Sequence, residues 1–215
     1  MKYYPVNLNM TNKRCVVVGG GDIAERKVER LLECGAQVTV VSKSLTPLLK
    51  ARKKTGQMDH IDRDYEDQAL DGAFMVIGAT DQNDVNERIS KDAMARGLLV
   101  NIVDDPDRCN FILPSLVQQG DLSIAVSTGG KSPALAKKLR KELEKQYGPE
   151  YQTLLVIMGI LRKRILAGDQ RAADNKAVFE DLVHSDILQA IREKDRGRVN
   201  TIIHDLTGIS MDVRI

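Results

Sequence analysis

Three glycines at positions 19–21 separate an apolar run from a helical pattern. Gly19-x-Gly21-x-x-Ala24 matches the fingerprint of dinucleotide-binding turns, in which a buried strand, a tight turn and a helix follow one another. Gly19 can take backbone angles closed to other residues, and Gly21 has no side chain that would block a pyrophosphate. A tight turn that binds nothing would use the same glycines, and an acid at position 22 would suit any helix N-terminus. The residues expected to hold a nucleotide here are Gly19, Gly21, Asp22 and Ile23.

The second apolar strand ends at Ser42-Lys43-Ser44. Dinucleotide sites typically carry an acid near this point for the ribose hydroxyls, and this chain has none. Ser42 or Ser44 would then be the hydrogen-bonding partner of the ribose, while Lys43 would permit a nucleotide with an extra phosphate.

Two more polar segments follow apolar strands. Thr80 and Asp81 come after the third strand, where they would line the ligand crevice or simply cap the next helix. Asp104 comes after the fourth strand, where its carboxylate would face the same crevice, although Asp104-Asp105-Pro106 is also a common turn sequence. No metal site is expected from the scattered histidines and cysteines.

A second glycine loop lies at positions 127–133, before a strongly basic helix. It combines backbone N–H groups, a lysine and a helix N-terminus, a combination that attracts anions. A structural turn is the alternative. The residues that would hold an anionic ligand are Thr128, Gly129, Gly130, Lys131 and Ser132.

The elements that must position these residues alternate along the first half of the chain. Apolar strands joined by helices predict an α/β fold with a Rossmann-like parallel sheet, whose ligands bind at the carboxyl ends of the strands. A small α+β region and an all-helical C-terminal region should follow, giving predicted divisions of 1–113, 114–148 and 149–215. The predicted strands are 15–18, 38–41, 74–79, 98–103, 111–117 and 122–126, and the predicted helices are 22–34, 45–54, 83–96 and 134–146.

Composition excludes several classes of protein. A net charge of +2 and an aromatic content of 4% argue against a nucleic-acid partner. Three scattered cysteines argue against a disulfide framework and favour a reducing cytoplasm. The N-terminus lacks the apolar run of a signal peptide, and no stretch is long enough for a membrane span.

Five ordered motifs in residues 1–146 resemble the N-terminal module of siroheme synthase and its stand-alone relatives, the precorrin-2 dehydrogenases. The motifs are the segments 18–27, 79–81, 101–104, 111–115 and 127–133. The resemblance implies NAD-dependent oxidation of precorrin-2 to sirohydrochlorin by a homodimer whose chains intertwine after about residue 113. Some members of the family also insert iron into sirohydrochlorin, and the sequence leaves that activity open.

The resemblance also assigns individual roles. The family's key aspartate aligns with Asp104, which would be the catalytic base, and Thr128 stands where siroheme synthase has a serine, so a hydroxyl is retained. The second glycine loop would bind the carboxylates of precorrin-2. In siroheme synthase a methyltransferase domain follows this module, so for this chain we expect methylation by another protein. The competing hypothesis is a regulatory module that senses NAD(H) without catalysis.

Overall fold

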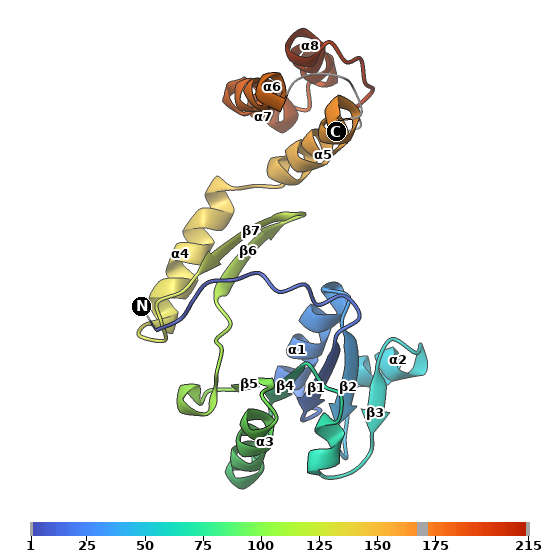
Figure 1. Cartoon of the computed structure of the whole chain (residues 1–215), viewed down its shortest axis with the longest axis vertical. Coiled ribbons are helices and arrows are strands. Elements are labelled where there is room, and N and C mark those ends of the chain that lie inside the picture. The colour runs from blue at the N-terminus through green and yellow to red at the C-terminus, as the bar shows by residue number, and fades with distance from the viewer. Residues whose placement is uncertain (1, 167–171, 214–215) are drawn as a thin grey trace. The chain divides into compact units, whose positions relative to one another are not determined.

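The computed structural model describes residues 2–166 and 172–213. The chain forms two compact units, Met1–Leu113 and Pro114–Ile215 (Figure 1). Each unit has its own apolar core. The further division predicted near residue 148 stays a prediction.

The first unit is built on a five-stranded parallel sheet with the strand order β3-β2-β1-β4-β5. The chain moves outward in one direction through β2 and β3, and in the other direction through β4 and β5. The order therefore reverses between β1 and β4, which is where ligands bind in open α/β sheets. The strands are β1 (Arg14–Val18), β2 (Gln37–Val41), β3 (Asp59–Ile61), β4 (Met75–Gly78) and β5 (Leu99–Ile102).

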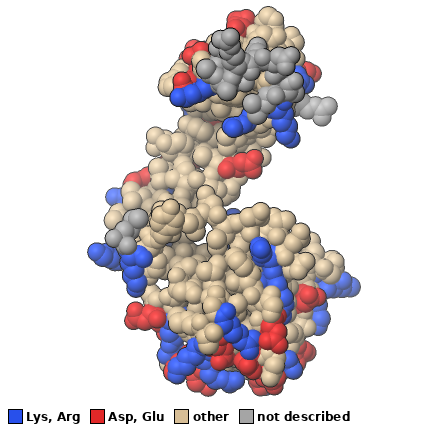
Figure 2. Space-filling model, in the orientation of Figure 1, with Lys and Arg blue, Asp and Glu red and all other residues tan. Residues whose placement is uncertain are grey.

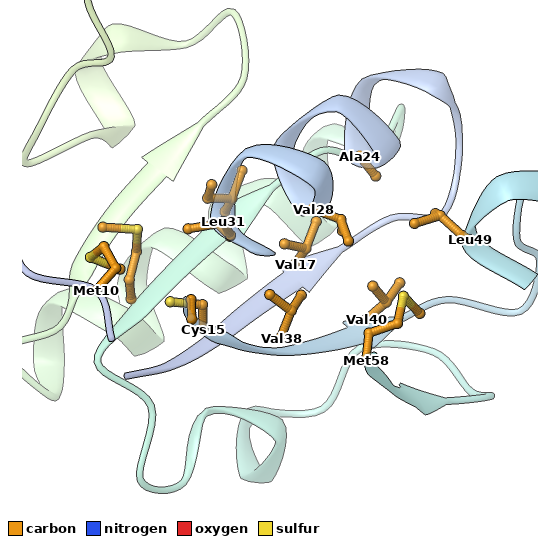
Figure 3. Close-up of a cluster of buried hydrophobic side chains, with 13 residues drawn as sticks. Met10, Cys15, Val17, Ala24, Val28, Leu31, Val38, Val40, Leu49 and Met58 are labelled. Carbon is orange, nitrogen blue, oxygen red and sulfur yellow. The ribbon is translucent and has the colours of Figure 1, made fainter. Parts of the chain in front are cut away.

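Helices cover both faces of this sheet because successive strand residues point to opposite sides. On one face Val17 and Val40 pack with Val28 of α1 (Asp22–Glu33) and Leu49 of α2 (Pro47–Lys54), as Figure 3 shows. On the other face β1, β4 and β5 pack against Ile89 of α3 (Asn83–Ala95) and against the 3-10 helix η1 (Asp67–Leu70). The predicted α/β fold with a Rossmann-like parallel sheet is confirmed.

Two strands of the structure differ from the prediction. β3 was not predicted, because it has only three residues and none of them is fully buried. The strand predicted at 111–117 begins only at Ser115, since Phe111 packs against the core of the first unit and its carbonyl accepts a hydrogen bond from Asn101 Nδ2 at 3.2 Å.

The second unit starts with a hairpin of β6 (Ser115–Gln119) and β7 (Leu122–Val126), followed by α4 (Pro133–Gln146). Ser132 caps α4 by accepting a hydrogen bond from the N–H of Leu135 at 3.2 Å, and Pro133 is the first residue of the helix. Four helices then share one apolar core. They are α5 (Glu150–Leu166), α6 (Ala172–His184), α7 (Ile187–Arg192) and α8 (Arg196–Thr207).

Within residues 2–166 and 172–213, none of the helices combines the length and the apolar character needed to cross a membrane. On the face of the first unit that Figure 2 shows, lysine and arginine side chains are interspersed with aspartate and glutamate. Interspersed charges of both signs do not build an extended field of one sign on that face.

Three free cysteines provide a test of this packing. Cys34 is exposed, Cys109 is partly buried, and Cys15 is fully buried with its pKa raised to about 11, first by burial and then by Cys34. Because the thiolate is the reacting form, iodoacetamide at pH 8 should label Cys34 first and Cys15 last in the folded protein. Mass spectrometry of tryptic peptides would measure the order, and equal labelling of all three thiols without denaturant would contradict this packing.

Candidate functional site

A cleft of about 1160 Å³ opens at the carboxyl ends of the strands in the first unit. Its walls come from the ends of β1 and β2, from the segments after β4 and β5, and from the first turns of α1 and α3. The structure brings every predicted nucleotide-binding residue and the predicted base into this cleft. They are Gly19, Gly21, Asp22, Ile23, Ser42, Lys43, Ser44, Thr80, Asp81 and Asp104.

The glycine turn has different steric demands at each position. Gly19 has φ +119°, and a Cβ there would lie 2.3 Å from the carbonyl oxygen of Ala79. A Cβ on Gly20 would lie 1.9 Å from the carbonyl oxygen of Ser44, whereas one on Gly21 would meet nothing within 4 Å. The chain itself therefore requires glycine at 19 and 20, while the space beside Gly21 opens toward the cleft. This cradle fits a dinucleotide pyrophosphate.

The start of α1 supports the same interpretation. Its N-cap residue is Gly21, and no side chain accepts a hydrogen bond from the first turn. The N-terminal N–H groups and the positive end of the helix dipole are thus left for an anion in the cleft. Asp22 and Ile23 follow directly and form the rim of the cleft.

The loop after β2 is held by its own side chains. The Ser42 hydroxyl donates to the carbonyl oxygen of Ser44 at 2.8 Å and accepts from the N–H of Ser44 at 3.3 Å. His60 Nε2 lies 2.8 Å from the carbonyl oxygen of Ser42. Ser42 thus has a structural role in this loop, and the binding of ribose hydroxyls by Ser42 or Ser44 stays a prediction.

Thr80 is similarly engaged. Its hydroxyl lies 2.9 Å from Oδ1 of the buried Asn86 and accepts a hydrogen bond from the N–H of Gln82 at 3.2 Å, while Asn86 Nδ2 donates to the Thr80 carbonyl at 3.0 Å. These bonds fix the turn between β4 and α3. The neighbouring Asp81 is exposed in the cleft.

Asp104 follows the end of β5 and is exposed in the cleft with φ +60°. Cys109 fastens the loop around it: the thiol accepts from the N–H of Ile102 at 3.1 Å and lies 3.1 Å from the carbonyl oxygen of Asp105. Burial raises the pKa of the Cys109 thiol, although its hydrogen bond with Ile102 acts in the opposite direction. The thiol therefore remains neutral near pH 7 and can act as a donor to a carbonyl.

Charged side chains that were not predicted also belong to this region, among them Arg63 and Asp84 in the cleft lining. Lys27 is half-buried on α1; burial lowers its pKa, the positive charge of Arg26 lowers it further, and the carboxylate of Asp104 raises it. Arg88 lies in the cleft with its guanidinium carbon 5.7 Å from the centre of the Tyr65 ring. Asp64 lies in the cleft beside Lys43. For Lys27 a sequence signal existed, since it follows Ile23 by one helical turn on the same face.

The second glycine loop belongs to the second unit. Gly129 and Gly130 have φ +62° and +84°. The Thr128 hydroxyl accepts from the N–H of Ser132 at 3.0 Å, and the Thr128 carbonyl accepts from the N–H of Lys131 at 3.2 Å. The loop thus satisfies several of its own N–H groups, and its strongest feature for an anion is the exposed Lys131 side chain.

Among the residues that the structure describes, no three or more His, Cys, Asp or Glu side chains gather as a metal-binding group.

The chain matches two protein families in sequence. Residues 6–115 match the family described as "Putative NAD(P)-binding", and residues 119–146 match the "Sirohaem biosynthesis protein central" family. The chain is 36% identical to siroheme synthase 1 of Aeromonas salmonicida (strain A449) over 207 residues, which cover 96% of this chain and 44% of that protein. It is 37% identical to siroheme synthase of Methylobacillus flagellatus over 207 residues, or 94% and 44% of the two chains. The chain thus spans less than half the length of these relatives.

The fold is also found in a solved structure. "SirC, precorrin-2 dehydrogenase" superposes with a TM-score of 0.82, covering 96% of this chain and 100% of its own, at 22% sequence identity. At 22% sequence identity, this likeness is evidence for a shared fold and not for a shared function.

Two glycine substitutions should separate folding from binding. Gly19→Ala places a Cβ against Ala79 at a positive φ, so we expect the free energy of unfolding to fall by about 2 kcal/mol or more. Gly21→Ala fills open space at φ −88°, so stability should change by less than about 0.5 kcal/mol while NADH affinity falls about tenfold. Urea unfolding and NADH fluorescence titration measure the two effects. Unchanged affinity of Gly21→Ala would contradict a pyrophosphate site beside this residue.

Proposed function

The chain belongs to the family described as "Putative NAD(P)-binding", and we propose that it oxidises precorrin-2 to sirohydrochlorin with NAD as the electron acceptor. The central-family match at residues 119–146 and the relatives named siroheme synthase support this substrate. The observation that carries the proposal is the presence of Asp104 in the same cleft as the glycine turn.

The reaction divides between cofactor and protein. NAD, when bound, supplies the hydride acceptor, so that precorrin-2 and NAD⁺ give sirohydrochlorin, NADH and one proton. The residues that would hold the cofactor are those of the glycine turn, the first turn of α1 and the loop after β2. The chain must also remove a proton from the substrate carbon skeleton, and this is the task that we assign to Asp104.

The surroundings of Asp104 suit that task. The carboxylate is exposed in the cleft, so a substrate can reach it, and the Cys109 hydrogen bonds fix the loop that carries it. Lys27 is close enough for the two side chains to attract each other electrostatically. A positioned carboxylate of this kind contributes about a hundredfold or more to a proton transfer.

The second unit contributes anion recognition in this proposal. Precorrin-2 carries eight carboxylates, and Lys131 with its neighbours Thr128–Ser132 offers a cation and polar groups at the start of a basic helix. The three free cysteines support a reducing cytoplasmic location.

A substitution at Asp104 tests the catalytic assignment. Asp104→Asn removes the base yet suits the φ of +60°, because asparagine tolerates the left-handed region better than alanine does. We expect kcat to fall at least about a hundredfold while NADH affinity stays within about twofold, since the carboxylate is not needed for the pyrophosphate site. The assay follows NADH and sirohydrochlorin absorbance from enzymatically made precorrin-2.

The matched control is Asp107→Asn, which removes an exposed carboxylate from the same loop. It should retain wild-type turnover. Full activity of Asp104→Asn would refute the role of Asp104 while leaving the dehydrogenase intact. A wild-type protein that binds NADH but neither binds nor oxidises precorrin-2 would instead favour a nucleotide-sensing module.

The second unit also supports a homodimer. α5 buries Leu154, Ile157 and Leu161 in its own unit, yet it exposes Val156 and Ile160 at 54% and 38% one turn apart. Leu135 and Leu139 of α4 repeat this pattern at 47% and 37%. On each helix the two exposed apolar side chains lie one turn apart on the same face, and together they form a short apolar strip that a second copy would cover.

Disruption of the apolar strip on α5 should separate the subunits. Val156→Glu combined with Ile160→Glu places two carboxylates in the proposed interface, so we expect light scattering after size exclusion to change from the mass of two chains to that of one. Met94→Glu, at an equally exposed apolar position of α3 in the first unit, is the control and should leave the mass unchanged. A wild-type protein with the mass of one chain would contradict the homodimer.

A further inference from the structure

The segment after β2 forms the edge of the cleft where the ribose of a dinucleotide would lie, here called the ribose edge. This edge has an unusual charge pattern. The segment Ser42-Lys43-Ser44 follows β2 without an acid, although an acid at this point is what lets a site accept the 2′-hydroxyl of the NAD ribose. A cation here is instead suited to the 2′-phosphate of NADP. Taken alone, Lys43 would make this cleft prefer NADP over NAD.

The structure brings an acid to the same place from a different strand. β3 runs parallel to β2 with Ile61 beside Val41, and the loop after β3 carries Asp64 into the cleft. Asp64 Oδ2 lies 2.6 Å from Lys43 Nζ. Both residues line the cleft, so a nucleotide bound at the ribose edge would contact this pair.

Polar contacts connect the ends of β2 and β3 next to the Lys43–Asp64 pair. The N–H of Ser42 donates to the carbonyl of Ile61 at 3.1 Å, and His60 Nε2 lies 2.8 Å from the carbonyl of Ser42. The backbone that carries Asp64 is therefore held at a fixed position relative to the backbone that carries Lys43.

Other cations of the cleft have different neighbours. Arg63 lies 3.4 Å from Glu66, and Arg88 lies over the Tyr65 ring. Lys43 is the cation of the loop that follows β2, and Asp64 is the carboxylate paired with it.

We propose that Asp64 sets the preference of this cleft for NAD over NADP, by neutralising Lys43 and by supplying the carboxylate that the segment after β2 lacks. This inference rests on the proposed function: Asp64 would be the residue that makes the proposed dehydrogenase use NAD. A 2′-phosphate would meet the Asp64 carboxylate and compete with it for Lys43, whereas a 2′-hydroxyl can donate a hydrogen bond to that carboxylate.

The pair suits a selectivity role because it contributes little to stability. Lys43 and Asp64 are 69% and 74% exposed, and ion pairs at such positions add almost nothing to the free energy of unfolding. Removal of Asp64 should therefore change which nucleotide binds without changing the fold.

The test compares NADH and NADPH affinities by fluorescence titration of the full chain. For Asp64→Asn we expect the ratio of the NADPH to the NADH dissociation constant to fall about tenfold, because an unpaired ammonium gains a charge-assisted contact with phosphate. Asp62→Asn makes the same change in net charge two residues away, outside the cleft lining, and should leave the ratio at the wild-type value.

A second substitution identifies the cause. Lys43→Ala in the Asp64→Asn background should return the ratio to within about twofold of the wild-type value, since the gain depends on the freed ammonium. An unchanged ratio in Asp64→Asn, or a gain that persists without Lys43, would overturn this proposal while NADH binding by the wild-type protein still upheld the nucleotide site. A wild-type protein that binds neither nucleotide would overturn both.

Discussion

The first unit depends on the close approach of three backbone segments at the ends of β1, β2 and β4. A side chain at Gly19 would collide with the carbonyl after β4, and one at Gly20 would collide with the loop after β2. The N–H of Gly19 also donates to the carbonyl of Val41 at 2.9 Å, and the Gly20 carbonyl accepts from the N–H of Thr46 at 3.0 Å. Only glycine allows this approach, which brings the polar residues of three different loops into one cleft.

Much of this arrangement could be predicted from the sequence because its causes are local. An apolar run ending in glycines, followed by a helical pattern, determines strand, turn and helix within about fifteen residues. The carboxyl-edge rule for parallel sheets then places Ser42, Thr80 and Asp104 on the same side. These positions needed no knowledge of which strands are neighbours.

The features that were missed depend on contacts between distant segments. β3 is short and incompletely buried, so its composition carries little signal, and without β3 nothing in the sequence places Asp64 beside Lys43. Cys109 appears as an isolated cysteine until the structure folds it back onto Ile102 and Asp105. The hydroxyls of Ser42 and Thr80 looked available for a ligand, but backbone groups within a few residues had already engaged them.

The N-termini of α1 and α3, which lie at the cleft, differ in capping from those of α2, α4 and α8. α2, α4 and α8 begin with Thr46, Ser132 and Asp195, and each of these side chains accepts a hydrogen bond from the first turn. α1 and α3 begin after Gly21 and Gln82, which provide no such bond, and both of these N-caps line the cleft. An uncapped first turn costs stability unless water or a ligand satisfies its N–H groups. The chain thus completes the starts of α2, α4 and α8 with its own side chains. It leaves the first turns of α1 and α3 open at the cleft, where an anionic cofactor can satisfy them.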